Sequence, residues 1–249
     1  MRLDKYLSDA GVLTRTESAR AAKNGQITVN GVVTRRSSGH IDPTKDTVCY
    51  NGQQIIYREF TYIMLNKPEG YVSATDDKLS PTVLALLPDE LQRIGLFPCG
   101  RLDKNTLGLM ILTNNGPLAH KLLSPKNHVD KMYFFNTKFP VSEADVERLE
   151  SGVDIGGYTT APCRVEMTGE REGYITLTEG KYHQIKLMAI AVNNQITYLE
   201  RVTFGEVVLD TSLARGQWRY LTDDEQASLE SRASKIPAES LEKHKGPQN

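Results

Sequence analysis

The first 25 residues have the apolar spacing of two short helices. Apolar residues recur at helical intervals from Leu3 to Ala10, and Gly11 ends this first predicted helix. Thr14 and Glu17 have the spacing of a capping box, in which each side chain bonds the other residue's backbone N–H. A second helix is therefore predicted from Thr14 to about residue 24, where Asn-Gly ends it.

A β-hairpin is predicted directly after these helices. Residues 26–29 alternate between polar and apolar side chains, as in a half-buried strand. Asn30-Gly31 is a strong signal for a two-residue hairpin turn, and residues 32–34 begin the return strand.

From about Tyr62 the chain alternates irregularly between strand and helix patterns. Strands outnumber helices, so we expect an α+β fold with a mainly antiparallel mixed sheet instead of a regular series of βαβ units. The last helix is predicted to begin after Thr222, which has Glu225 at capping-box spacing. The other expected strands are 62–66, 109–113, 132–139, 174–178, 196–201 and 206–209, and the other expected helices are 83–91, 117–123, 142–151 and 183–192.

The composition is that of an ordinary globular protein. Hydrophobic residues make up 39% and charged residues 24% of the 249 positions. Apolar runs stay well below the roughly 18 residues of a membrane span, and the first residues lack a secretory signal, so we expect a cytoplasmic protein without membrane contact. Cys49, Cys99 and Cys163 lie far apart and fit neither a disulfide framework nor a metal site, so no metal is expected.

Positive charge is concentrated at the start of the chain. Residues 1–58 contain nine lysines and arginines against five acids, an excess of four, so the rest must carry −5 to give the formal total of −1. Cations grouped on one side of a small helical pair suit a phosphate backbone, although a solvated helix face would explain any one of them. The candidate RNA-binding residues are Arg2, Lys5, Arg15, Arg20 and Lys23.

A charged pair stands between glycines and an apolar strand at Arg101-Leu102-Asp103. In an extended segment Arg101 and Asp103 share one face, and Leu102 points the other way. A carboxylate there can be a nucleophile or a general base, but from these residues alone a surface ion pair is the more common explanation. GxGxxG, GxxxxGK[ST] and HExxH are all missing from the sequence, which removes the usual signals for nucleotide or zinc-protease chemistry.

The N-terminal pattern resembles a known RNA-binding domain. Arg-Leu-Asp-Lys-Tyr-Leu at 2–7, Thr14-Arg15 and Gly-Gln-Ile-Thr-Val-Asn-Gly at 25–31 resemble the domain named after small-subunit ribosomal protein four, also called the αL motif. The resemblance covers about 60 residues and implies RNA binding. That domain accompanies several unrelated activities, so it implies no chemistry.

Four further motifs, in order, resemble the ribosomal pseudouridine synthases. The catalytic motif of that family resembles Gly-Arg-Leu-Asp-x-x-Thr-x-Gly-Leu at 100–109, followed by Leu-Thr-Asn-Asn-Gly at 112–116. The other three are Asn-Lys-Pro-x-Gly at 66–70, Lys-x-Tyr at 131–133 and Glu-Gly-Lys-Tyr-His-Gln-Ile-Lys-x-Met at 179–188. With the N-terminal domain, the resemblance spans roughly residues 1–230.

The resemblance implies a catalytic site. Asp103 would be the catalytic aspartate acting on a flipped-out uridine, and Lys186 the cation that keeps its carboxylate ionised. Tyr133 would place its ring against the target base, and Arg101 would fill the space left by the flipped nucleotide or hold a phosphate. The isomerisation needs no cofactor, because it neither gains nor loses atoms or electrons. His183 is expected to be a surface or supporting residue.

The motif at 179–188 resembles the small-subunit enzymes more than their large-subunit relatives. We therefore expect a monomer that modifies a uridine of 16S ribosomal RNA, free or in a pre-ribosomal small subunit. The alternatives are the same chemistry on 23S RNA, or a ribosome-assembly factor that binds RNA without modifying it. Leu107, Leu187 and Asn193-Asn194 depart from the family pattern, which puts RNA contacts of the late helix in doubt.

Three parts of the chain are expected from these patterns. Residues 1–58 would form the RNA-binding domain, and residues 59–234 the catalytic domain. Residues 235–249 are predicted to be a polar tail.

Overall fold

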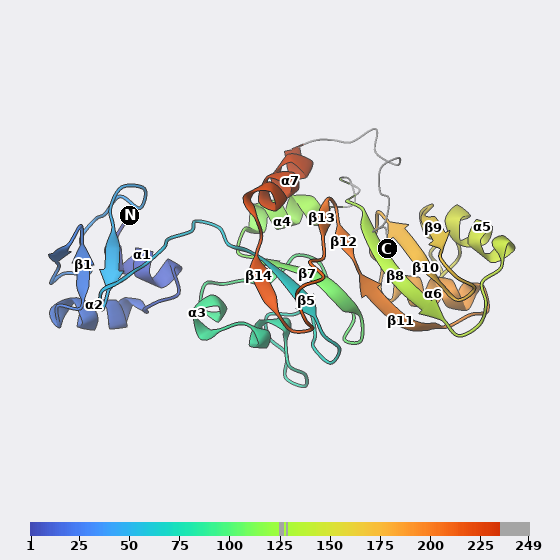
Figure 1. Ribbon diagram of the computed structural model, residues 1–249, viewed down its shortest axis with the longest axis horizontal. Helices are drawn as coiled ribbons and strands as arrows, with labels where there is room; N and C mark the ends of the chain where they lie inside the picture. The colour runs from blue at the N-terminus through green and yellow to red at the C-terminus, as the bar shows by residue number, and fades with distance from the viewer. Residues whose placement is uncertain (125–126, 128, 235–249) are drawn as a thin grey trace.

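The computed structural model describes residues 1–124, 127 and 129–234 (Figure 1). The predicted polar tail at 235–249 lies outside the described residues. Figure 1 shows a small N-terminal part (blue) joined by a single extended segment to a larger α+β part.

The N-terminal part consists of two helices and a four-stranded sheet in the order β2-β1-β3-β4. The capping box is confirmed, because Thr14 and Glu17 each accept a hydrogen bond from the other's backbone N–H. The hairpin turn is also confirmed: Asn30 and Gly31 have φ of 53° and 78°, as a two-residue hairpin requires. The elements are α1 (Leu3–Asp9), α2 (Arg15–Lys23), β1 (Ile27–Val29), β2 (Val32–Val33), β3 (Val48–Tyr50) and β4 (Gln53–Gln54).

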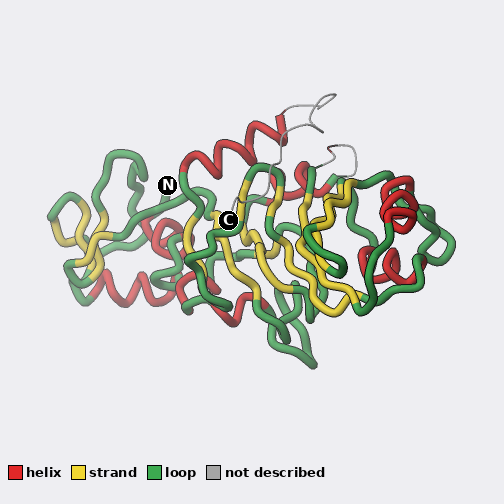
Figure 2. Tube along the Cα trace, turned by 45° about the vertical axis from the view of Figure 1, so that its right-hand side comes forward, coloured by secondary structure: helices red, strands yellow, loops and turns green. Residues whose placement is uncertain are grey.

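The larger part is built on an eight-stranded sheet. Its strands follow the order β14-β5-β7-β11-β8-β10-β9, with β6 paired to β7, and Figure 2 shows them side by side with helices around them. Every pairing in this sheet is antiparallel except β7 with β11, so the predicted α+β class with a mainly antiparallel sheet is confirmed. The strands are β5 (Tyr62–Lys67), β6 (Phe97–Pro98), β7 (Leu107–Thr113), β8 (Lys131–Thr137), β9 (Arg164–Met167), β10 (Glu172–Leu177), β11 (Ile196–Arg201) and β14 (Trp218–Tyr220).

The parallel pairing of β7 with β11 is a seam between two antiparallel halves of the sheet. It involves only the partners Leu107–Glu200 and Gly108–Arg201. A Cβ on Gly108 would lie 2.3 Å from the Arg201 carbonyl oxygen, so the backbones approach as closely as glycine allows. The buried Arg201 side chain also crosses the seam, donating from Nε to the Leu109 carbonyl at 2.7 Å.

The sheet is buried on both faces at its centre. On β5, Tyr62 and Met64 face one apolar cluster, whereas Ile63 and Leu65 face the other. The first cluster is covered by α4 (Gly116–Leu123) and α7 (Asp223–Ser234), as Figure 1 shows. The second is covered by a 3₁₀ turn (Val83–Leu86) and α3 (Asp89–Gln92) near one end and by α5 (Glu143–Ser151) and α6 (Gln184–Ala191) near the other.

One predicted helix differs in outline from the structure. The single helix expected at 83–91 is split into a 3₁₀ turn (Val83–Leu86) and α3 (Asp89–Gln92), because Pro88 forces the preceding residue out of the helical region. The strand expected at 206–209 is confirmed as the short β13 (Val207–Val208), which pairs with β12 (Thr203–Phe204) in a hairpin.

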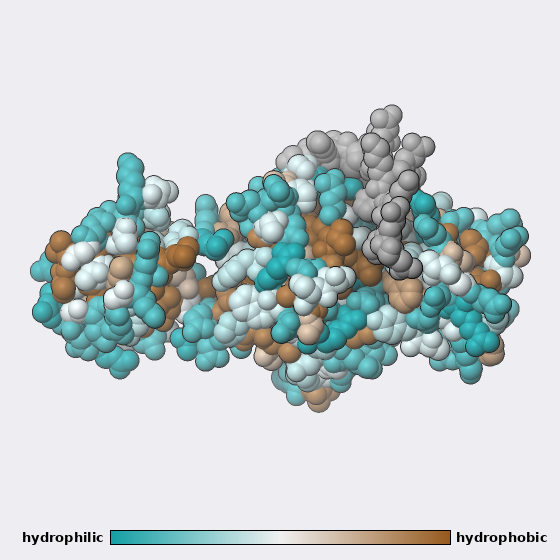
Figure 3. All heavy atoms as spheres, viewed as in Figure 1, coloured by the Kyte–Doolittle hydropathy of each residue, from teal (hydrophilic) through white to brown (hydrophobic). Residues whose placement is uncertain are grey.

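The outer surface in the view of Figure 3 is largely hydrophilic, with scattered hydrophobic residues. In the described ranges, no helix combines the length and the apolar character needed to cross a membrane.

Candidate active site

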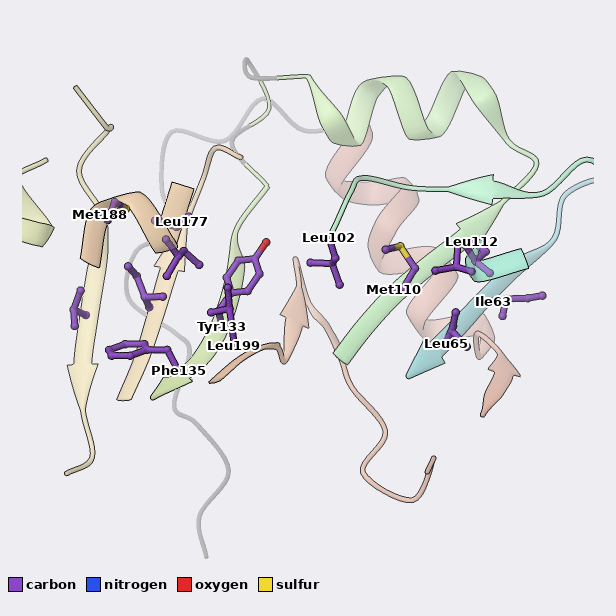
Figure 4. Close-up of a cluster of buried hydrophobic side chains, with 14 of the residues drawn as sticks. Ile63, Leu65, Leu102, Met110, Leu112, Tyr133, Phe135, Leu177, Met188 and Leu199 are labelled. Atoms are coloured by element: carbon purple, nitrogen blue, oxygen red, sulfur yellow. The ribbon is translucent and has the colours of Figure 1, made fainter. Parts of the chain in front are cut away.

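The segment that carries Asp103 runs between β6 and β7 and is fixed by its neighbouring leucine. Leu102 is 7% exposed and lies in the apolar cluster between the side chains of the two sheet halves (Figure 4). Its backbone N–H donates to the Ser73 hydroxyl and its carbonyl accepts from that hydroxyl, at 3.0 and 2.8 Å. Arg101 is exposed and Asp103 is half-buried, and all three residues line a cleft of about 670 Å³. The expected alternation is thus visible in the exposure of these side chains, although Leu102 also reaches the cleft.

Asp103 meets Lys186 across this cleft. Lys186 lies on α6, 83 positions away in the sequence, and its Nζ is 2.6 Å from Asp103 Oδ2. The two side chains are about one quarter exposed, so the pair is only partly screened by solvent. Lys186 Nζ also donates to Asn105 Oδ1 at 3.0 Å, which holds the ammonium over the loop.

Tyr133 lies deeper in the same cleft. It comes from β8, is 8% exposed, and its ring stands in the row of apolar side chains on this face of the sheet (Figure 4). Tyr133 pairs with Ile175 of β10 and Arg201 of β11, so strands on both sides fix its backbone. The structure thus brings Asp103, Tyr133 and Lys186 to one cleft, with Arg101 exposed on its lining.

Lys67 is a residue whose part in this site the sequence did not reveal. It ends β5, and its side chain is fully buried. Its Nζ donates to the carbonyl oxygens of Asp103, Lys104 and Thr106 at 3.1, 3.1 and 2.8 Å, and to that of Pro68 at 3.1 Å. Burial lowers the pKa of the Lys67 ammonium to about 8. The ammonium therefore acts as a clamp that sets the backbone of the loop carrying Asp103.

A second lysine with a lowered pKa lies at the start of β8, where it is half-buried. Partial burial, aided by repulsion from Arg201, lowers the pKa of Lys131 to about 8. Its Nζ donates to the Val129 carbonyl at 2.7 Å and lies 5.6 Å from the centre of the Phe204 ring. Lys131 belongs to the Lys-x-Tyr motif, in which Tyr133 lines the cleft and Lys131 does not.

The five basic residues proposed to bind RNA are all exposed, but two of them already pair with carboxylates of the protein. Arg2 forms a two-point ion pair with Asp4, at 3.0 and 2.6 Å, and Lys5 bonds Asp9 one turn along α1. Local carboxylates thus offset part of the positive charge of these two residues. The remaining candidates lie along α2: Arg15, Arg20 and Lys23.

The described residues do not contain a cluster of side chains suited to binding a metal ion. Among them, no group of three or more histidine, cysteine, aspartate or glutamate side chains could hold a metal ion. Cys49, Cys99 and Cys163 are free thiols, and burial raises the pKa of Cys99 to about 11 and that of Cys163 to about 12.

Comparison with known proteins identifies the family to which both parts of the chain are similar. Residues 61–191 match the family model described as RNA pseudouridylate synthase, and residues 1–46 match the S4 domain. The chain belongs to the RNA pseudouridine synthase family. The expected boundary at residues 58 and 59 falls between the two matches and stays a prediction.

Pseudouridine synthases from several bacteria are similar over nearly their full length. An uncharacterised RNA pseudouridine synthase of Bacillus subtilis is 46% identical over 230 residues, covering 90% of this chain and 96% of that protein. The ribosomal small subunit pseudouridine synthase A of Vibrio cholerae is 37% identical, covering 92% and 99%, and that of Escherichia coli is 36% identical, covering 92% and 100%. A crystal structure of a pseudouridylate synthase, 33% identical, superposes with a TM-score of 0.65 over 92% of this chain and 99% of that chain.

Proposed function

We propose that this pseudouridine synthase converts a uridine of small-subunit ribosomal RNA to pseudouridine, with Asp103 as the catalytic carboxylate. The observation that carries the proposal is the Asp103–Lys186 pair, 2.6 Å apart, in a cleft that Tyr133 also lines. The choice of small-subunit RNA is supported by the two ribosomal small subunit pseudouridine synthases A that match this chain over nearly their whole length.

The proposed reaction balances without a cofactor. The bond from uracil N1 to the ribose C1′ breaks, the base turns, and a bond from C5 to C1′ forms. C5 loses a proton and N1 gains one, so atoms and electrons are conserved. A carboxylate that acts on either the sugar or the ring does so as an anion, and the Lys186 ammonium, 2.6 Å from Asp103 Oδ2, pairs with this carboxylate and fixes its position.

Access to the glycosidic bond requires that the uridine leave its stack. Enzymes that act on a base take it into a pocket, where aromatic side chains hold it. The cleft has the volume of a typical ligand site, and Tyr133 offers a ring beside Asp103. Arg101 is exposed on the same lining and is placed to contact the RNA backbone.

The N-terminal domain provides a second contact with RNA. Its match to the S4 domain and the exposed cations of α2, Arg15, Arg20 and Lys23, support binding of the phosphate backbone. Because one chain supplies every residue of the proposed site, we propose that a monomer is active.

The test is release of tritium from 16S ribosomal RNA transcribed with uridine labelled at C5, because the reaction removes that hydrogen. The wild-type protein should release tritium, and Asp103→Asn should not, while its RNA affinity stays within about twofold. Asp77→Asn is the matched control, since Asp77 also lines the cleft but accepts bonds from the Leu79 and Ser80 backbone.

Three results would contradict parts of the proposal. Turnover by Asp103→Asn would remove the catalytic assignment. Tritium release from 23S but not 16S RNA would overturn the choice of substrate. RNA binding by the wild-type protein without release from either RNA would indicate a binding protein instead of an active enzyme.

A further inference from the structure

Two aromatic rings stack at the rim of the cleft, outside the residues assigned above. The rings of Tyr182 and His183 lie 3.8 Å apart, centre to centre, at 19° to one another. His183 Nε2 is 3.6 Å from Asp103 Oδ1, and both rings belong to the cleft lining. Tyr182 is 75% exposed. The carboxylate, the imidazole and the phenol ring therefore form a series that leads from the catalytic carboxylate outward.

The segment that carries these rings is held firmly. Glu179 accepts hydrogen bonds from the Gln184 amide at 2.8 Å, the Ala161 N–H at 3.0 Å and the Tyr158 hydroxyl at 2.7 Å. The Gln184 side chain, 4% exposed, also accepts from the Lys181 N–H at 2.9 Å. This network fixes both ends of the turn, so an exposed tyrosine here is an ordered feature and not a side chain on a loose loop.

The backbone at His183 shows that the turn is specialised. His183 adopts φ 50° and ψ 28°, in the left-handed region, directly before α6 begins. Residues other than glycine rarely adopt this conformation, and where they do so beside a site it commonly serves the position of a side chain. Here it turns the imidazole toward Asp103 and brings Tyr182 over it.

We propose that Tyr182, backed by His183, is a stacking platform for the nucleotide next to the target uridine. This inference rests on the proposed function, because it places a neighbouring base beside the one that enters the cleft. Every base has a π-face, so an exposed ring binds a nucleotide without reading its sequence. The exposed cations Arg101 and Lys181 line the same cleft and suit the phosphates on either side of such a base, which favours RNA over an apolar protein partner.

The test compares Tyr182→Ala with Tyr182→Phe, in the full-length protein. Loss of base–aromatic stacking weakens binding by roughly 5- to 160-fold, so Tyr182→Ala should lose that much affinity for 16S RNA and as much in kcat/KM for tritium release. Tyr182→Phe keeps the ring and should stay within about twofold of wild type. Phe139→Ala is the matched control, because Phe139 is also an exposed aromatic residue, at 52%, but lies outside the cleft lining.

The outcomes separate the platform from the proposed function. Rescue by phenylalanine with an unchanged thermal midpoint in both variants supports stacking, because a merely structural role would lower the midpoint of Tyr182→Ala. Wild-type affinity and turnover in Tyr182→Ala would overturn the platform while leaving the enzyme assignment intact. If the wild-type protein released no tritium but Tyr182→Ala still lost RNA affinity, the proposed function would fail and the platform would stand as an RNA contact.

Discussion

Replacing Lys67 with methionine removes a fully buried ammonium group and keeps a side chain of similar length. In the wild-type protein Nζ donates to four carbonyl oxygens at 2.8 to 3.1 Å. Two of these, on Asp103 and Lys104, also accept backbone N–H groups, at 3.0 and 2.9 Å. The substitution therefore matters most for the carbonyl oxygens of Pro68 and Thr106, which lose the hydrogen bond that Lys67 Nζ donates.

The expected change in stability is small, because two effects oppose each other. The buried Thr106 acceptor and the half-buried Pro68 acceptor, once they lose this donor, cost about 2–6 kcal/mol together. Burial lowers the pKa of Lys67 from its ordinary 10.5 to about 8, a cost of about 3 kcal/mol that the methionine variant avoids. Near pH 7 the free energy of unfolding of the variant should thus lie between about 1 kcal/mol above and about 3 kcal/mol below that of the wild type.

The pH dependence gives a sharper expectation. Between pH 8 and 10.5 the unfolded chain still holds the Lys67 proton that the folded chain has released, so the contribution of this group to stability rises with pH. Methionine has no such proton. The wild-type free energy of unfolding minus that of the variant should therefore increase by about 3 kcal/mol from pH 7 to 10.5, as measured by urea denaturation.

Activity should change more than stability. The clamp fixes the backbone of the Asp103 loop, and a displacement of about 1 Å at a catalytic group can cost on the order of 100-fold in rate. We expect kcat for tritium release to fall at least tenfold in Lys67→Met. Lys104→Met is the stability control, since Lys104 is an exposed lysine on the same loop. A pH-independent difference in unfolding free energy, or wild-type turnover in Lys67→Met, would refute the reasoning.

Two further substitutions test the charges of the site and of α2. Lys186→Met removes the ammonium that pairs with Asp103, so kcat for tritium release should fall by at least about tenfold; turnover equal to the wild type would contradict the pairing role. Changing Arg15, Arg20 and Lys23 together to alanine should reduce the slope of log affinity against log salt by about 2, measured by filter binding to 16S RNA. An unchanged slope would show that α2 makes no phosphate contacts.

Elements with local signals were predictable from the sequence, and those that depend on distant partners were not. The Thr14 capping box and the Asn30-Gly31 hairpin are specified within a few residues, and both are present. In contrast, β14 is three residues long and exists because it pairs with β5, with Trp218 opposite Leu65. Nothing within residues 218–220 indicates that partner.

The same distinction between local signals and distant partners applies to the residues of the site. The charges of Arg101 and Asp103 alone favoured a surface ion pair, and the motif resemblance pointed to this loop as a site. The resemblance also predicted Lys186 and Tyr133, which line the same cleft. The clamp of Lys67 was not predictable, because its acceptors are backbone carbonyl groups, which leave no trace in side-chain identity. Its only sequence signal was a lysine at the end of an apolar strand within a motif.

The seam between β7 and β11 divides the site as well as the sheet. Asp103 precedes β7 on one side, whereas Tyr133 on β8 and Lys186 on α6 belong to the other. Two residue pairs and the Arg201 side chain join these halves at the seam. Because a Cβ at Gly108 would lie 2.3 Å from the Arg201 carbonyl oxygen, a side chain there would push β7 away from β11 and so displace Asp103 relative to Lys186.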